Sequence, residues 1–222
     1  MEKSQFTPYV THNTNSESAL LKISEEHFNF MNLRRTIREF SPRPIPMEVL
    51  ENLIMAASTA PSGANKQPWT FCVVTNAELK TKIKIAAEQE EFESYNGRMT
   101  DQWIKDLKEI GTTWQKPFLE IAPALIIVFK RSYEFVEVKK VNNYYTTESV
   151  GIACGFLLQA IHACGLVALT HTPSPMDFLT KILDRPQNEK PFLLIPVGYA
   201  AENTTVPNIE RKKKEDVIHC YN

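Results

Sequence analysis

Several features that mark common protein classes are scarce in this 222-residue sequence. Only 7 glycines stand against 14 prolines, which disfavours a glycine-rich phosphate loop as the main binding device. The four cysteines, Cys72, Cys154, Cys164 and Cys220, form no CxxC pair, so the pattern argues against a zinc site. Cys72, Cys154 and Cys164 lie in apolar runs, and we expect them to be reduced core residues.

Charge of one sign and long apolar runs are also missing. Lysine plus arginine is 25 and aspartate plus glutamate is 26, so the charge balance gives no reason to expect a nucleic-acid partner. The first 18 residues are polar and lack an apolar signal region. Residues 150–169 form the most apolar segment, but Gln159, His162 and a break at Gly165 keep it short of a membrane span. We expect a cytoplasmic protein without a membrane or nucleic-acid partner.

The motifs of the commonest enzyme classes are absent as well. The sequence contains no GxSxG, Walker A, HExxH or Rossmann fingerprint, which argues against the usual hydrolase, nucleotidase and NAD-binding classes. The composition is 43% hydrophobic and 23% charged, which is typical of a globular protein. A chain of this length buries roughly 70% of its unfolded surface and can form its own core.

Helical and strand patterns alternate along the chain. Helices are predicted from Ser24, as the N-cap, and over residues 47–58, 79–95, 100–110, 147–164 and 176–183. Strands are predicted over residues 69–75, 123–130, 166–172 and 192–199. This order indicates an α+β or α/β layered domain over residues 24–222, after a flexible arm at 1–23 and with a polar extension at 200–222. The helix at 147–164 is apolar nearly all round, so we expect a second copy of the chain to cover it.

Two segments have the composition of ligand-binding turns. The first holds guanidinium groups and a hydroxyl that suit a phosphate, although a solvated basic turn is the simpler explanation on its own: Arg34, Arg35, Thr36 and Arg38. The second joins a helix to a strand, where free backbone N–H groups can face a ligand or simply form a connector: Ser62, Gly63 and Ala64.

Three further groups carry titratable or hydroxyl side chains. Glu91 and Tyr95 are four residues apart on a predicted helix, and with Lys116 they could hold a zwitterion or form a solvated face. Thr170 and Thr172 flank His171 at a strand end, where ligand crevices are common, yet a lone histidine is more often structural. A basic cluster begins at Arg211, which could contact a phosphate or be solvated; no histidine pair has metal-ligand spacing.

Taken together, four segments resemble the flavin-dependent nitroreductase superfamily and, within it, the iodotyrosine deiodinase family. They are RRTIREF (34–40), APSGANKQPWTF (60–71), ESVGIACGFLLQAI (148–161) and LLIPVGY (193–199). The pattern E-x3-Y, followed 21 residues later by K, is also similar to that family and is present as Glu91, Tyr95 and Lys116. The resemblance implies an α+β fold with a central mixed sheet flanked by helices, an intertwined homodimer, and FMN at the subunit interface. It implies reductive removal of halide from mono- and diiodotyrosine, with an external reductant or a nicotinamide-dependent reductase.

The resemblance also implies roles for the candidate residues. The FMN phosphate and ring edge are held by Arg34, Arg35, Thr36, Arg38 and Arg211. The isoalloxazine is approached by Ser62 and Gly63 of the second chain and by Thr170 and Thr172, with the Thr172 hydroxyl as donor to flavin N5. The substrate is held by Ala64 N–H at the phenolate and by Glu91, Tyr95 and Lys116 at the amino-acid end, under a lid at about 88–116. His171 receives no role.

Two other functions share part of this pattern. A general NAD(P)H-dependent nitroreductase or flavin reductase would use the same FMN residues but would not need Glu91, Tyr95 and Lys116. A flavin- or halotyrosine-binding protein without activity would keep the binding residues alone.

Overall fold

A computed structural model describes residues 7–10 and 15–221 of the chain and separates into two units, Met1–Arg34 and Arg35–Asn222. The first unit contains the helix α1 (Glu17–Asn32), which begins at Ser16, whose side chain accepts a hydrogen bond from Ala19 N–H at 3.3 Å. The predicted start at Ser24 is therefore wrong. Ser24 lies inside the helix, where its hydroxyl donates to the carbonyl of Leu21 at 2.7 Å. The predicted arm at residues 1–23 lies partly outside the described residues.

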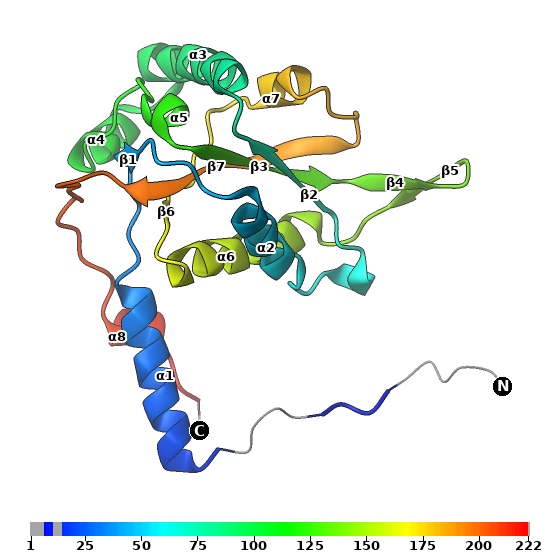
Figure 1. Ribbon diagram of the computed structural model, residues 1–222, viewed down its shortest axis with the longest axis vertical. Coiled ribbons are helices and arrows are strands. Elements are labelled where there is room, and N and C mark those ends of the chain that lie inside the picture. The colour runs from blue at the N-terminus through cyan, green and yellow to red at the C-terminus, as the bar shows by residue number, and fades with distance from the viewer. Residues whose placement is uncertain (1–6, 11–14, 222) are drawn as a thin grey trace. The chain divides into compact units, whose positions relative to one another are not determined.

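The second unit is built on an antiparallel sheet (Figure 1). Its strands run in the order β1 (Phe40–Ser41), β7 (Glu189–Ala200), β3 (Ala124–Arg131) and β2 (Trp69–Val74), and β6 (Val167–Ala168) also pairs with β7. All the ladders are antiparallel, and an isolated bridge between Thr36 and Ala168 is parallel. A second sheet is the hairpin of β4 (Tyr133–Val136) and β5 (Lys139–Asn142), which the sequence analysis did not predict.

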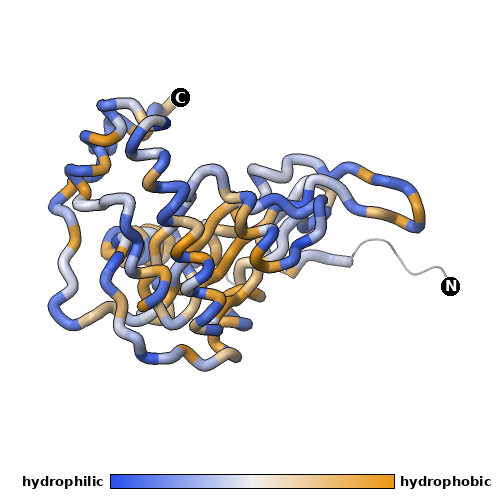
Figure 2. Tube along the Cα trace, turned by 90° about the horizontal axis from the view of Figure 1, so that it is seen from above, coloured by the Kyte–Doolittle hydropathy of each residue, from blue (hydrophilic) through white to orange (hydrophobic). Residues whose placement is uncertain are grey.

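The central strand β3 explains why both faces of the sheet are covered. Residues 124–129 of this strand are completely buried. Successive side chains alternate between faces, so Ile126 and Val128 join one cluster, and Leu125, Ile127 and Phe129 join the other. Figure 2 shows the hydrophobic residues gathered in the sheet and in the segments that pack on it.

Helices supply the rest of each cluster. The first cluster contains residues of α2 (Met47–Ser58) and α6 (Thr146–Ala163). The second contains residues of α3 (Ala77–Glu93), α5 (Phe118–Ile121) and α7 (Asp177–Ile182). The remaining helices of the second unit are a 3-10 turn at Gly63–Asn65, a π turn at Ser94–Arg98, α4 (Asp101–Glu109) and α8 (Lys214–Val217). The helices and strands are therefore layered as predicted, although α5, α8 and β1 were not foreseen.

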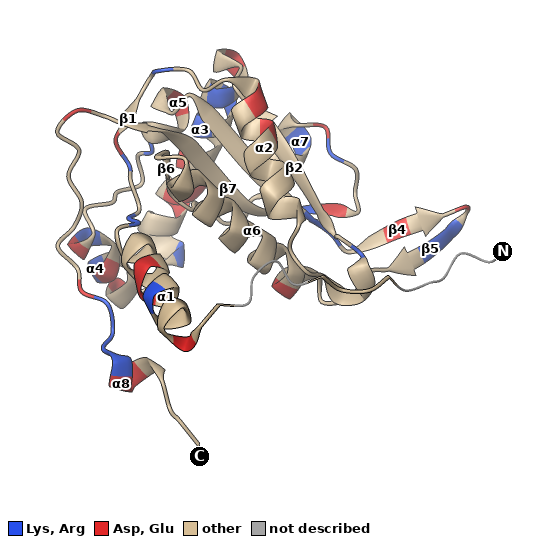
Figure 3. Ribbon diagram, turned by 60° about the horizontal axis from the view of Figure 1, so that its bottom comes forward, with Lys and Arg blue, Asp and Glu red and all other residues tan. Residues whose placement is uncertain are grey.

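The helix α6 is less enclosed than a central helix would be. It carries the buried residues Val150, Ala153 and Leu157 on one side, whereas Ile152 is 43% exposed and Phe156 is 38% exposed. Figure 3 shows that α6 is almost without charged residues, whereas α4 carries residues of both signs. Among the described residues, no helix has both the length and the apolar character needed to cross a bilayer.

Two sequence expectations need correction. Cys164 is exposed, because it lies at the C-terminal end of α6, so its assignment to the core is wrong. Cys154 is buried and Cys72 is half-buried, and both are free thiols. The strand predicted over 166–172 is reduced to the two residues of β6 and a bridge between His171 and Leu194.

Candidate functional site

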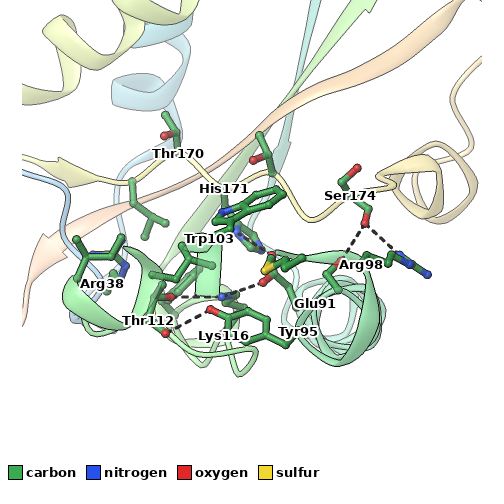
Figure 4. A pocket seen from close by; sticks show the side chains of 17 residues that line it. Arg38, Glu91, Tyr95, Arg98, Trp103, Thr112, Lys116, Thr170, His171 and Ser174 are labelled. Carbon is green, nitrogen blue, oxygen red and sulfur yellow. Dashed lines mark hydrogen bonds and ion pairs between the residues drawn. The ribbon is translucent and has the colours of Figure 1, made fainter. Parts of the chain in front are cut away.

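A cavity of about 470 Å³ lies where α3, the π turn, α4 and the segment after β6 meet (Figure 4). Two parts of the chain, residues 91–116 and residues 170–174, supply most of its polar side chains. One wall is formed by Glu91, Ser94, Tyr95, Arg98, Thr112 and Lys116, and the other by Thr170, His171, Thr172 and Ser174. Apolar side chains complete it: Met99, Trp103, Leu107, Ile110, Phe118 and Leu169. An amphipathic cavity of this size is suited to a small molecule with both aromatic and charged parts.

The structure brings Glu91, Tyr95 and Lys116 together in this cavity. Glu91 lies in the last turn of α3, and Tyr95 follows about one turn later in the π turn. The Lys116 ammonium lies 3.2 Å from Oε2 of Glu91 and 5.7 Å from the centre of the Tyr95 ring. The Tyr95 hydroxyl donates to the carbonyl of Thr112 at 3.3 Å. The spacing on the helix thus predicted a real cluster, whose role stays a prediction.

The ion pair between Glu91 and Lys116 is enclosed by protein. Glu91 is 8% exposed and Lys116 is 4% exposed. Burial raises the pKa of Glu91, and the neighbouring Lys116 opposes that shift. Burial lowers the pKa of Lys116, and Glu91 opposes that shift in turn. Because a buried ion pair rarely adds net stability, its presence in a cavity points to binding or catalysis.

Contacts along the chain fix the position of Lys116. Its backbone N–H donates to Oε1 of Glu88 at 2.7 Å. Its ammonium donates to Oγ1 of Thr112 at 3.3 Å and to the carbonyl of Thr113. Lys116 also directly precedes Pro117, the N-cap of the short helix α5, whose first two residues are buried. These contacts hold the ammonium at the cavity.

The opposite wall is an extended segment in which exposed and buried residues alternate. Thr170, His171 and Thr172 all line the cavity, and the two threonines are exposed to solvent whereas His171 is buried. The backbone is held by two hydrogen bonds with Leu194, of 2.8 Å from His171 N–H and 3.0 Å to the His171 carbonyl. The period of two therefore presents both threonine hydroxyls on one side of this segment.

A second cavity of about 370 Å³ lies beside the first, and Arg38 lines both. Its cationic and hydroxyl residues are Arg38, Lys108, Thr36 and Thr205, and its lining also holds the carboxylates of Glu39 and Glu109. The donors among these groups could bind a phosphate, and the two carboxylates oppose an anion. The guanidinium of Arg35 donates to the carbonyl of Pro207, which ties the basic turn to the C-terminal extension.

The other predicted residues do not join these cavities. Arg34 ends the first unit, and Arg211 is an exposed residue in the segment before α8. Ser62, Gly63 and Ala64 line neither cavity. They form a turn in which the Ser62 hydroxyl accepts a hydrogen bond from Gln67 N–H at 2.9 Å, and Gly63 N–H donates to Oγ of Ser149 at 3.4 Å.

The turn at Ser62–Asn65 has a constrained backbone. Ala64 has φ of 49°, in the left-handed region that few residues with a side chain adopt. A Cβ at Gly63 would lie 2.9 Å from a ring carbon of Tyr145 and 3.1 Å from the carbonyl oxygen of Tyr144. Such a conformation persists only where the surroundings hold it, and it is common at binding sites.

The sequence analysis missed several residues of the first cavity. Trp103 and Leu107 are four apart on α4 and both line it. An aromatic and an aliphatic residue at this spacing on a polar helix were a signal that the helix has a ligand-facing side. Phe118 and Ser174 had no such signal, because tertiary contacts alone bring them to the cavity.

Comparison with known proteins identifies the family. The sequence model of the nitroreductase family matches residues 32–199, and the chain belongs to this family. Within it, the chain is similar to the iodotyrosine deiodinase of Haliscomenobacter hydrossis, at 60% identity over 99% of both chains. It is 44% identical to the iodotyrosine deiodinase of Danio rerio, over 91% of this chain and 70% of the relative.

A solved structure agrees with these relatives. The crystal structure of oxidised iodotyrosine deiodinase bound to FMN and 3-iodo-L-tyrosine is similar with a TM-score of 0.76 and 32% identity. The match covers 88% of this chain and 98% of that one. The nitroreductase-like fold expected from the sequence is thereby confirmed.

Proposed function

We propose that this chain is an FMN-dependent oxidoreductase that removes iodine reductively from mono- and diiodotyrosine and releases iodide and tyrosine. The observation that carries the proposal is the buried pair of Glu91 and Lys116 beside Tyr95, in a chain 60% identical to an iodotyrosine deiodinase over its whole length. A single cavity with a carboxylate, an ammonium and a phenol suits the amino-acid end of a tyrosine.

The ion pair explains why a zwitterion is preferred. Glu91 binds the substrate ammonium and Lys116 binds its carboxylate. Before binding, the two side chains neutralise each other at 3.2 Å. A zwitterion exchanges this one pair for two, whereas a phenol without the amino-acid end offers no charge to either side chain. Because a buried charge without a partner costs several kcal/mol, the cavity discriminates against simple halophenols.

The residues beside the cavity fit FMN. Arg38 and Thr36 line the second cavity with Lys108, and these groups provide charge and donors for the phosphate. The resemblance adds Arg35 and Arg211 to the phosphate site. Thr170 and Thr172 line the first cavity, and Thr172 is the proposed donor to flavin N5. FMN, when bound and reduced, supplies the two electrons that replace iodine by hydrogen.

A second copy of the chain completes the proposed site. Ser62, Gly63 and Ala64 do not line the cavity of their own chain, and we infer from the resemblance that they serve the site of the second copy. The half-exposed Ile152 and Phe156 on the almost uncharged α6 give this homodimer an apolar contact. In that arrangement Ala64 N–H donates to the substrate phenolate and stabilises the charge there.

The segment from about 88 to 116 serves as the lid. It contributes Trp103 and Leu107 to the cavity from one face of α4, while Trp103 remains 53% exposed. Closing this face on the iodinated ring excludes water and strengthens the ion pairs with the zwitterion. An external reductant or a nicotinamide-dependent reductase returns the electrons.

The general nitroreductase function remains the second candidate, because several structures of similar fold bear that name, including one with bound FMN from Bacteroides fragilis at a TM-score of 0.66 and 18% identity. A comparison of oxidants separates the two functions. The reduced protein is mixed anaerobically with 3-iodotyrosine or with a nitroaromatic compound. The proposal expects fast reoxidation by iodotyrosine, and fast reoxidation by the nitroaromatic alone would contradict it.

A further inference from the structure

The proposed function leaves one buried ionisable residue of the cavity unexplained. His171 is 7% exposed and lies between Thr170 and Thr172, with its ring edge-on to Phe118 at 5.7 Å between centroids. Its Nδ1 lies 4.0 Å from Oε1 of Glu91, whose other oxygen, Oε2, pairs with Lys116 (Figure 4). The carboxylate of Glu91 therefore lies between a cation and an imidazole.

The two ring nitrogens of His171 have different surroundings. Nε2 is buried and has no hydrogen-bond partner among the described residues. Nδ1 is the nitrogen that lies near a carboxylate oxygen of Glu91. A neutral ring with its proton on Nδ1 can donate to that oxygen, and this is the tautomer that the inference requires.

The surroundings keep the ring neutral. Burial, followed by the charges of Lys116 and Arg38, lowers the pKa of His171 to about 3. A neutral ring is what this position requires, because an imidazolium would compete with the substrate ammonium for the same carboxylate. A neutral N–H can instead hold one oxygen of Glu91 and leave the charge for the ligand.

We propose that His171 is the positioning residue of the zwitterion site, whose Nδ1–H holds Oε1 of Glu91 in place when Lys116 turns to the substrate carboxylate. This inference rests on the proposed function. The present separation of 4.0 Å is longer than a hydrogen bond, and contacts of this kind commonly tighten when a ligand binds. Without His171, the loss of Lys116 as a partner would leave Glu91 free to rotate.

Replacement by the two amides tests which nitrogen acts. In the FMN-loaded full chain, His171→Asn places an amide nitrogen near the position of Nδ1, and His171→Gln places one near Nε2. Binding of 3-iodotyrosine is measured by titration calorimetry. We expect His171→Leu and His171→Gln to weaken it about 10-fold, His171→Asn to remain within about 3-fold of the wild type, and FMN affinity to change less than about 3-fold in all three.

A double-mutant comparison tests whether His171 acts through Glu91. In the Glu91→Ala protein, we expect His171→Asn and His171→Gln to bind iodotyrosine equally, because the acceptor that His171 holds is gone. Equal losses when Asn and Gln replace His171 in the protein with Glu91 intact, or an Asn–Gln difference that persists in Glu91→Ala, would overturn the inference. If the Leu variant does not fold, the Asn–Gln comparison still decides.

The two proposals fail differently. A wild-type protein that binds FMN but not 3-iodotyrosine would remove the proposed function and this inference with it. A wild type that binds 3-iodotyrosine, with a flat series at position 171, would overturn the inference alone.

Discussion

The carboxylate of Glu91 and the ammonium of Lys116, 3.2 Å apart, reach each other from the end of α3 and from the residue before α5, across the segment that contains α4. Both side chains are buried and line one cavity. A movement of residues 92–115, which connect them, would change how well this ion pair is shielded from water. The proposed lid and the proposed zwitterion site are therefore parts of one structural unit.

Removing either charge should impair substrate binding selectively. Glu91→Gln and Lys116→Ala are each expected to weaken 3-iodotyrosine binding about 100-fold, because one charge of the zwitterion is left without a buried partner. FMN affinity should change less than about 3-fold. Calorimetric titration of both ligands into each variant measures the difference.

Lys84→Ala is the matched control for this prediction. Lys84 of α3 also pairs with a glutamate, Glu120 of α5, at 2.7 Å, but both side chains are partly exposed and neither lines the cavity. Exposed ion pairs contribute little, so this variant should bind both ligands normally. Equal loss of FMN and iodotyrosine in the Glu91 and Lys116 variants would refute the assignment of these residues to the substrate.

An acidic residue on the exposed face of α6 should prevent dimer formation. Phe156→Glu introduces a charge on a face that otherwise exposes Ile152 and Phe156, so we expect a monomer that no longer retains FMN. Light scattering coupled to size exclusion gives the mass, and the visible spectrum gives the flavin content. Ile85→Glu, at a residue of α3 that is 63% exposed, should remain a yellow dimer. A dimeric Phe156→Glu protein with full flavin would contradict the proposed interface.

The substrate cluster was predictable only in part from the sequence. Glu91 and Tyr95 share a helical face because of their spacing, and that part needed no tertiary information. The approach of Lys116 depends on the path of the segment between α3 and α5, which periodicity does not describe. The burial of His171 between two exposed threonines was likewise not predictable from periodicity. It depends on the bridge between His171 and Leu194, which fixes the backbone there.

The hairpin of β4 and β5 shows why other elements were missed. Its turn begins at Glu137, which has φ of 56°. Hairpin turns with positive φ normally contain glycine or asparagine, and their absence removed the usual sequence signal. Ser24 shows the opposite error, because a residue typical of N-caps can also lie inside a helix and bond to the preceding turn.

A side chain at Gly63 should destabilise the turn at Ser62–Asn65, which is proposed to contact the site of the second chain. Gly63→Ala would bring Cβ within 2.9 Å of the Tyr145 ring and 3.1 Å of the Tyr144 carbonyl oxygen. We expect a loss of about 1–3 kcal/mol in the free energy of unfolding, measured by denaturant titration. Gly97→Ala, where no atom lies within 4 Å, is the control and should be much less affected. Equal stability of the two variants would show that the turn has room to adjust.

His171 should make the stability depend on pH in a defined direction. The free imidazole takes up a proton near pH 6.5, whereas the buried ring does so near pH 3. Between these values the unfolded chain binds more protons, so the contribution is complete above pH 6.5 and is lost as the pH falls toward 3. The unfolding free energy of the wild type should therefore fall more steeply than that of His171→Asn, by about 1.4 kcal/mol per pH unit.

Denaturant titrations of both proteins between these pH values measure this slope. Groups distant from His171 are present in both proteins and cancel in the comparison, whereas Glu91 is its neighbour, so the same comparison is repeated with Glu91→Gln in both proteins. Parallel pH curves would mean that the His171 ring is protonated as easily in the folded protein as in the unfolded chain.

Anaerobic reoxidation tests the central proposal most directly. The FMN-loaded protein is reduced, the excess reductant is removed, and one equivalent of 3-iodotyrosine is added. The account predicts that the absorbance of oxidised flavin returns fully, with one iodide and one tyrosine formed per flavin. A reduced flavin that stays bleached, with 3-iodotyrosine recovered intact, would contradict it.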